Sequence, residues 1–250
     1  MARSSALPVR RLAARPSPAG PPRRATAPRT PLTRARIVAA ALELIERDGL
    51  AAFSVRGVAG VLGCEPMSLY HYFPSKVHLQ DALVDHLLAE LHSDDETSDP
   101  IERLRRLIQA FRALAHRHPK LFPLLATHRL NTPTGVRVID HVLGAVRAAL
   151  PDDRMAAQFF RVLSYYVTGA ALDETSGYAK GPSAAVPVTD DYIAAHCPHL
   201  ARSAPYFKSP WWDSTFDLGL ESLLASMRAA AGEMRAETPS APKPVVRPKR

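Results

Sequence analysis

Residues 51–83 carry the local pattern that most constrains this chain: two short predicted helices, a tight turn between them, and a longer helix behind. Ser54 precedes an apolar run of helical period, so its hydroxyl can cap the first helix. Gly63 follows that run, where a helix end favours a left-handed residue that glycine adopts at low cost. Pro66 suits the first turn of the next helix, because the N–H it lacks would have no partner there. The pattern predicts a helix-turn-helix corner.

The predicted second helix of this corner, 66–72, has two faces. Leu69, Tyr72 and Phe73 recur at the spacing of a core face, and the opposite face carries Met67, Ser68, Tyr70 and His71. Amphipathic helices over 33–47 and from Lys76 onward can enclose a small core with it. Such a corner can place a helix end in the major groove of DNA. It also occurs in helical bundles that never touch DNA, so the pattern alone leaves both interpretations open.

The segment LGCEPMSLYHYFPSKVHLQDAL resembles the signature of the tetracycline-repressor family, and the resemblance covers roughly residues 33–92. It implies that Arg56 reads a base and that Tyr70 and Lys76 contact phosphates, although Tyr70 could instead pack in the core. The segment departs from the family's usual pattern at Cys64 and Glu65 and in the Pro66-Met67 start of the second helix. These departures leave the operator sequence open. The DNA-facing residues that the resemblance implies are Arg56, Pro66, Met67, Ser68, Tyr70, His71 and Lys76.

The formal net charge of +8 is concentrated at the two ends of the chain. Residues 1–36 hold nine arginines and no acid, and Lys243, Arg247, Lys249 and Arg250 close the chain without one. Both ends lack core-forming residues, which predicts a disordered basic arm over 1–31 and a disordered basic tail over 236–250. The arm can follow the DNA backbone or a minor groove, or it can be a solvated segment that adds only non-specific affinity.

The remaining composition narrows the class of protein. No apolar run approaches the ~20 residues that cross a bilayer, and the N-terminus lacks a signal-peptide core. Cys64 and Cys197 are too few for a disulfide scaffold or a cysteine-based metal site. We therefore expect a cytoplasmic protein with no membrane partner, no metal and no cofactor. The resemblance to the tetracycline-repressor family implies that it is bacterial and is associated with the nucleoid when bound to DNA.

The second half of the chain is predicted to be a larger helical domain over 93–235, behind a helix-turn-helix domain over 32–92, in an all-α fold. It resembles the C-terminal domain of the tetracycline repressor in two stretches, SYYVTGAALDETS (164–176) and FDLGLESLLASM (216–227). The resemblance implies that these two helices pair with their copies in a homodimer. Gly169, Ala170 and Ala171 would allow close approach, although a monomer that buries both helices internally is the alternative.

Aromatic and histidine side chains are the candidates for a ligand pocket in this domain. They are His92, Phe111, His116, Phe122, Phe159, Phe160, Tyr165 and Tyr166, with Trp211 and Trp212 as a lid or partner contact. His92 aligns with a histidine that contacts the drug in the tetracycline repressor. Aromatic residues at helical spacing also occur in ordinary cores, and the identity of the effector stays open.

Together these features predict a homodimeric transcription regulator. We expect it to be a repressor that binds a palindromic operator in double-stranded DNA and is released when an unidentified small molecule binds. Two alternatives belong to other classes. A non-specific DNA-coating protein would rely on the basic ends. An enzyme would need a site among the histidines, but His116 and His118 lie on different faces of a helix, and no nucleophile elbow or phosphate loop is present.

Overall fold

The structure, a computed structural model, describes residues 31–91, 99–176 and 184–237. Every regular element in these ranges is an α-helix or a 3₁₀ turn, so the all-α prediction is confirmed. The predicted basic arm except for its last residue, most of the predicted tail, and His92 lie outside the described residues. None of the helices in the described ranges has the length and apolarity needed to cross a membrane.

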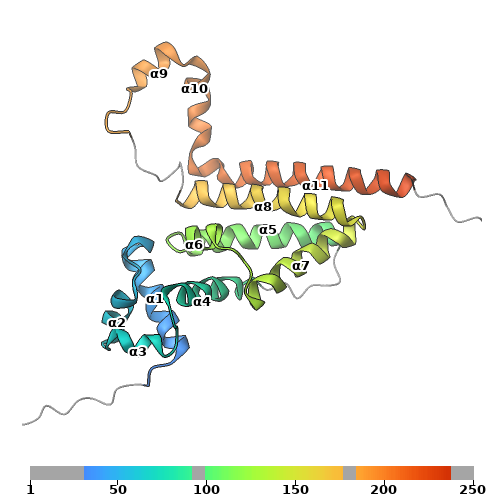
Figure 1. Cartoon of the computed structure of the whole chain (residues 1–250). Helices are drawn as coiled ribbons and strands as arrows, with labels where there is room; N and C mark the ends of the chain where they lie inside the picture. Colours follow the sequence, from blue (N-terminus) through green and yellow to red (C-terminus); the bar gives the residue numbers. More distant parts are fainter. Residues whose placement is uncertain (1–30, 92–98, 177–183, 238–250) are drawn as a thin grey trace, which may run out of the picture. The chain divides into compact units, whose positions relative to one another are not determined.

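The first group of helices builds a small core around α1 (Figure 1). The elements are α1 (Arg34–Asp48), η1 (Leu50–Ala52), α2 (Val55–Leu62), α3 (Pro66–Tyr70) and α4 (Lys76–Leu88). Thr33 caps α1, since its side chain accepts a hydrogen bond from the N–H of Arg36. Ile37 and Ile45 of α1, Val58 of α2 and Leu83 of α4 are fully buried. Their burial fixes α2 and α4 against α1, and α3 lies at the end of this group.

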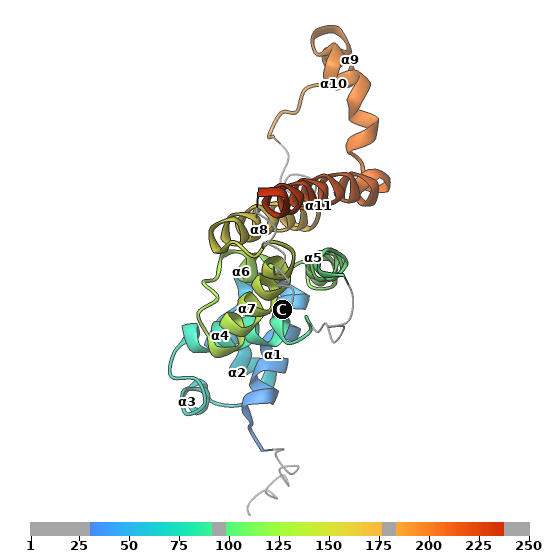
Figure 2. The ribbon, with the colours of Figure 1, turned by 90° about the vertical axis from the view of Figure 1, so that its right-hand side faces the viewer.

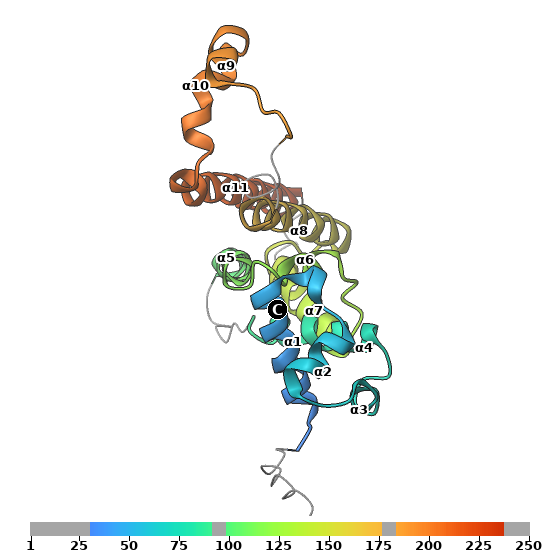
Figure 3. The same cartoon turned by 90° about the vertical axis from the view of Figure 1, so that its left-hand side faces the viewer.

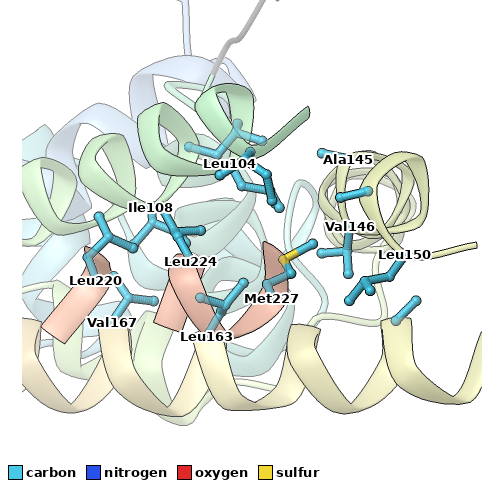
Figure 4. Packing of buried hydrophobic residues seen from close by; sticks show 14 of the residues in the cluster. Leu104, Ile108, Ala145, Val146, Leu150, Leu163, Val167, Leu220, Leu224 and Met227 are labelled. Atoms are coloured by element: carbon cyan, nitrogen blue, oxygen red, sulfur yellow. The ribbon is translucent and has the colours of Figure 1, made fainter. Parts of the chain in front are cut away.

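The second group is a larger helical core. Its elements are α5 (Pro100–Arg117), α6 (Phe122–Thr127), α7 (Pro133–Ala149), α8 (Asp153–Thr175) and α11 (Trp212–Glu237). Figure 4 shows aliphatic side chains of four of these helices meeting in one cluster. Leu104 of α5, Val146 of α7, Leu163 of α8 and Leu224 of α11 all belong to it. This core holds α5 against α7 and α8.

Helices α8 and α11 lie side by side and run in opposite directions, and they stay adjacent in the turned views (Figures 1, 2 and 3). Tyr166 of α8 stacks on Phe216 of α11, with ring centroids 5.3 Å apart, and its hydroxyl donates to the Phe216 carbonyl oxygen at 2.5 Å. A Cβ at Gly219 would come within 2.4 Å of the Tyr166 hydroxyl. Any other residue at this position would force the Tyr166 ring to move from its place against α11.

The chain between α8 and α11 forms α9 (Asp190–His196), α10 (Pro198–Ser203), η2 (Ala204–Phe207) and η3 (Ser209–Trp211), and no residue of 184–211 is buried. The apolar pattern of the sequence predicts helices over 156–172 and 214–231, and both are longer in the structure: α8 spans 153–175 and α11 spans 212–237. The first two residues of the predicted tail, Ala236 and Glu237, are therefore helical, because α11 continues beyond the apolar stripe from which its end was read.

Candidate nucleic-acid interface and cavity

The corner between α2 and α3 has the geometry that its sequence predicts. The Ser54 hydroxyl accepts from the N–H of Gly57 at 3.0 Å, and Gly63 ends α2 in the left-handed region with φ 62°. The N–H of Cys64 then donates to the Ala59 carbonyl oxygen at 3.1 Å. Pro66 opens α3 as expected, but α3 ends at Tyr70 instead of residue 72. The turn therefore aims a short helix away from the core that holds it.

Two apolar anchors and one arginine fix the inner side of α3. Leu69 and Phe73 are buried. The guanidinium of Arg34 lies 4.2 Å from the centroid of the Phe73 ring, and its Nη1 donates to the carbonyl oxygen of Tyr72. From the sequence, Arg34 was counted only among the nine arginines of residues 1–36 and was given no role in the corner. No local pattern pairs it with a residue 38 positions away.

The outer side of α3 is open to solvent. Met67 is 70% exposed and Tyr70 is 39% exposed. The sequence left open whether Tyr70 packs in the core, and the structure shows that it does not. The ammonium of Lys76 lies 5.1 Å from the Phe53 ring centroid, at the start of α4. Of the other predicted DNA-facing residues, Arg56 and His71 are exposed and Pro66 and Ser68 are half-buried.

This outer face offers side chains suited to a DNA duplex. An arginine can donate two hydrogen bonds to a guanine edge, and lysine and tyrosine side chains bind phosphate oxygens. An exposed methionine supplies an apolar contact for a thymine methyl group. The contacts of the individual residues with DNA stay predictions.

A cavity of about 650 Å³ lies between the second group of helices and the end of α4. Its wall comes from the end of α4, from α5, α7 and α8, and from the segment that begins in α6 and leads to α7. Most of the lining is apolar, and its size is that of sites that hold drug-sized molecules. Phe111 and Phe160, both candidates from the sequence, contribute their rings to this wall.

The other predicted pocket residues in the described ranges lie elsewhere. Phe122 is fully buried behind Phe111, with ring centroids 5.4 Å apart, and Phe159 packs against the aliphatic core. Tyr165 is 67% exposed and does not line the cavity. Tyr166, Trp211 and Trp212 do not line the cavity either. Helical spacing places an aromatic residue on a face, but it does not distinguish a packed face from a hollow one.

His116 belongs to a charge cluster around the buried carboxylate of Glu174 rather than to the cavity. Its Nε2 lies 2.7 Å from an oxygen of Glu174, and Arg112 donates two hydrogen bonds to the same carboxylate at 2.8 and 3.1 Å. Arg112 also donates to Asp213 at 2.8 Å. Burial alone would lower the pKa of Arg112, but these hydrogen bonds outweigh it and the pKa is raised. The cluster joins α5, α8 and α11.

Helix α4 is held to the larger group by carboxylates along its length. Asp81 lies 2.8 Å from Nε2 of His128, and Asp85 accepts from the Thr132 hydroxyl at 2.5 Å. Past its end, Glu90 accepts from Arg117 at 2.9 Å. Partial burial would raise the pKa of Glu90, but the Arg117 hydrogen bond and nearby positive charges outweigh it and lower the pKa. Sequence reasoning missed all of these pairs.

The cavity wall and the attachment of α4 share residues. His128, which is bonded to Asp81, lines the cavity, and so do Leu88 and Ala89 at the end of α4. At its other end α4 begins with Lys76, beside the α3 corner. One helix therefore runs from the cavity to the exposed helix-turn-helix corner.

The outward side of the α8–α11 pair exposes large apolar side chains. Leu218 is 71% exposed, Tyr165 67% and Val162 42%. A Cβ at Gly169 would meet nothing within 4 Å, so this stretch of α8 is uncovered within one chain. Such a face is typical of a surface that another molecule covers.

Two family models match the chain. The model for bacterial regulatory proteins of the tetR family matches residues 37–83, which contain the helix-turn-helix corner. The model for the tetracyclin repressor-like C-terminal domain matches residues 93–231, which contain most of the cavity wall, all of α8 and most of α11. The second match alone covers more than half of the chain.

Individual relatives match over most of their length. The chain is 27% identical over 224 residues to the HTH-type transcriptional repressor DrrR1 of Streptomyces coeruleorubidus, covering 84% of this chain and 83% of the relative. It is 28% identical over 208 residues to an HTH-type transcriptional regulator of Saccharopolyspora erythraea, covering 80% of this chain and 86% of the relative.

Solved structures with the same fold include regulators from Streptomyces coelicolor. A possible TetR family transcriptional regulator superposes with a TM-score of 0.67 and 29% identity, over 79% of this chain and 99% of its own. The TetR family protein ActR, crystallised with actinorhodin, superposes with a TM-score of 0.66 and 28% identity, over 81% of this chain and 100% of its own.

Proposed function

The chain belongs to the tetR family of bacterial regulatory proteins, and we propose that it is a homodimeric repressor that leaves a palindromic operator when a small molecule fills its cavity. The family consists of transcription regulators and not of enzymes, and this chain is a DNA-binding, ligand-responsive member of it. A palindrome, release on binding and the roles of individual residues are our proposal. An operator on the bacterial chromosome would place its action in the cytoplasm.

One observation carries the release mechanism: α4 ends in the cavity wall and begins beside the helix-turn-helix corner. A ligand in the cavity would touch Leu88 and Ala89 of α4, and also His128, which holds Asp81. A ligand can shift α4 only by the difference between its affinities for the two positions of that helix. Displacing the His128–Asp81 hydrogen bond is one source of such a difference.

The uncovered face of α8 and α11 supports a dimer. Leu218 and Tyr165 would each leave solvent when a second copy packs against them, and a two-fold interface uses the same patch on both chains. Two recognition helices related by a two-fold axis would contact two half-sites of an inverted repeat. We therefore expect the operator to be palindromic.

The decisive experiment selects DNA from a random pool with the full chain and then measures affinity by fluorescence anisotropy. A specific regulator should prefer the selected sequence over random DNA by ~10³-fold or more. Arg56→Ala should weaken operator binding by about 1–3 kcal/mol and leave random DNA nearly unaffected. Arg47→Ala is the matched control, because this exposed arginine lies in the last turn of α1, on a different helix from Arg56, and pairs with Asp48.

A non-specific DNA-coating protein is the alternative that this experiment separates. It would show no preferred sequence, and Arg56→Ala and Arg47→Ala would lower its affinity equally. Deleting residues 1–31 would then remove most of its binding. In a specific regulator the same deletion retains the sequence preference and flattens the salt dependence, by roughly 0.9 in log–log slope for each phosphate that the arm neutralises.

A further inference from the structure

The ionisable residues in the cavity wall are all basic. Among the described residues that line it there are two arginines and two histidines, Arg137, Arg161, His128 and His141, and none is acidic. His128 faces Asp81, and the guanidinium of Arg161 lies 5.5 Å from the Tyr165 ring centroid. That leaves two basic side chains of α7 directed at the cavity.

Arg137 and His141 are four residues apart, so they lie on the same face of α7. Both line the cavity and both are solvent-exposed, which places them where the cavity meets solvent. Neither forms an ion pair or hydrogen bond with another residue in the described ranges, whereas Arg147, farther along the same helix, pairs with Asp153 at 2.9 Å. Asp140, the acidic residue of α7, does not line the cavity.

The interior beyond this basic mouth is apolar. The rings of Phe111 and Phe160 and the side chains of Leu107 and Val142 form part of its wall. Such a wall favours an apolar molecule, because burying a charged group there without a partner is costly. A negative group on that molecule would instead meet Arg137 at the mouth, while a cationic molecule would meet like charge.

We propose that the effector is a largely apolar organic anion. Its ring system occupies the cavity, and its carboxylate, sulfonate or phenolate lies at the mouth beside Arg137 and His141. This deepens the proposed function and rests on it for the link to DNA release, but the ligand chemistry can be tested on the protein without DNA.

The test uses two fluorescent probes with the same ring system, titrated into the full chain. 1-Anilinonaphthalene-8-sulfonate carries a sulfonate, and N-phenyl-1-naphthylamine is its neutral counterpart. We expect each to saturate a site, and the neutral probe to displace the anionic one. Arg137→Met should weaken the anionic probe about fivefold, the scale of one partly exposed charge-assisted contact, and change the neutral probe less than twofold. Arg147→Met, with the same change in charge on the same helix, should change neither.

Four results would overturn the proposal. Arg137→Met could weaken both probes equally or neither of them, or Arg147→Met could match its effect, which would mean that net charge and not the mouth attracts the anion. Failure of both probes to saturate the wild-type chain would also reject it. Operator affinity, measured separately, tests the regulator: an anionic probe that binds as expected without releasing the operator would leave the ligand chemistry standing and contradict the release mechanism.

Discussion

Replacing Gly63 tests whether the left-handed residue at the end of α2 builds the helix-turn-helix corner. Its φ of 62° and ψ of 36° cost an L-residue about 1–2 kcal/mol. Alanine restricts the unfolded chain and returns about 0.4–1 kcal/mol, so Gly63→Ala should destabilise the protein by about 1 kcal/mol. A Cβ at this site would meet nothing within 4 Å, so steric overlap adds nothing to this figure.

Gly60, on the same helix, is the matched control. It has helical geometry and equally open space around a new Cβ, so Gly60→Ala should stabilise by about 0.5–1 kcal/mol. The two variants have identical composition and should differ by about 2 kcal/mol in the free energy of unfolding. Urea unfolding followed by circular dichroism, at one fixed protein concentration, measures this difference. Equal effects of the two substitutions, or a stabilising Gly63→Ala, would refute the assignment of the corner to Gly63.

Three further outcomes follow from the ion pairs and the exposed apolar face. Glu174→Ala should destabilise by about 3 kcal/mol in urea unfolding, because it removes the buried carboxylate that accepts two hydrogen bonds from Arg112 and leaves this guanidinium, whose side chain is 13% exposed, with only the exposed Asp213. Asp213→Asn, at a carboxylate 90% exposed, should cost less than about 1 kcal/mol. Similar losses for the two variants would contradict the burial argument. The folded-state pKa of Glu90 is below its ordinary 4.5, so the stability that its ionised form contributes is complete above pH 4.5 and is lost as the pH falls through the folded pKa. The unfolding temperature of Glu90→Gln should therefore fall less on acidification than that of the wild type. Parallel curves of unfolding temperature against pH would exclude the interaction. Leu218→Glu should shift sedimentation from dimer to monomer, and an unchanged dimer would place the interface elsewhere.

The parts of the molecule that sequence predicted are those set by neighbouring residues. Ser54, Gly63 and Pro66 act within one turn of their own helices, so their roles follow from local stereochemistry, and the resemblance to a known family supplied the face of α3. The contacts that hold the site together join distant positions. Arg34 reaches Tyr72 and His128 reaches Asp81, 38 and 47 residues apart, and no periodicity encodes such pairs.

The pocket was predicted least well, because it too depends on contacts between residues that are far apart in the sequence. Phe122 and Phe111 have equivalent aromatic signals in the sequence, yet only Phe111 borders the cavity. A hollow arises from the relative placement of five helices, which depends on all of their side chains at once. Arg137 and His141 passed unnoticed because two basic residues on an amphipathic helix are typical of a solvated face.

A hydroxyl-radical footprint of the full chain on its selected operator is the most direct test of the central claim, that paired α3 helices read an inverted repeat. We predict two protected segments related by two-fold symmetry on one side of the duplex, both absent in Leu218→Glu at concentrations where that variant is monomeric. A single asymmetric segment, or uniform weak protection along the whole duplex, would contradict a dimeric sequence-specific regulator.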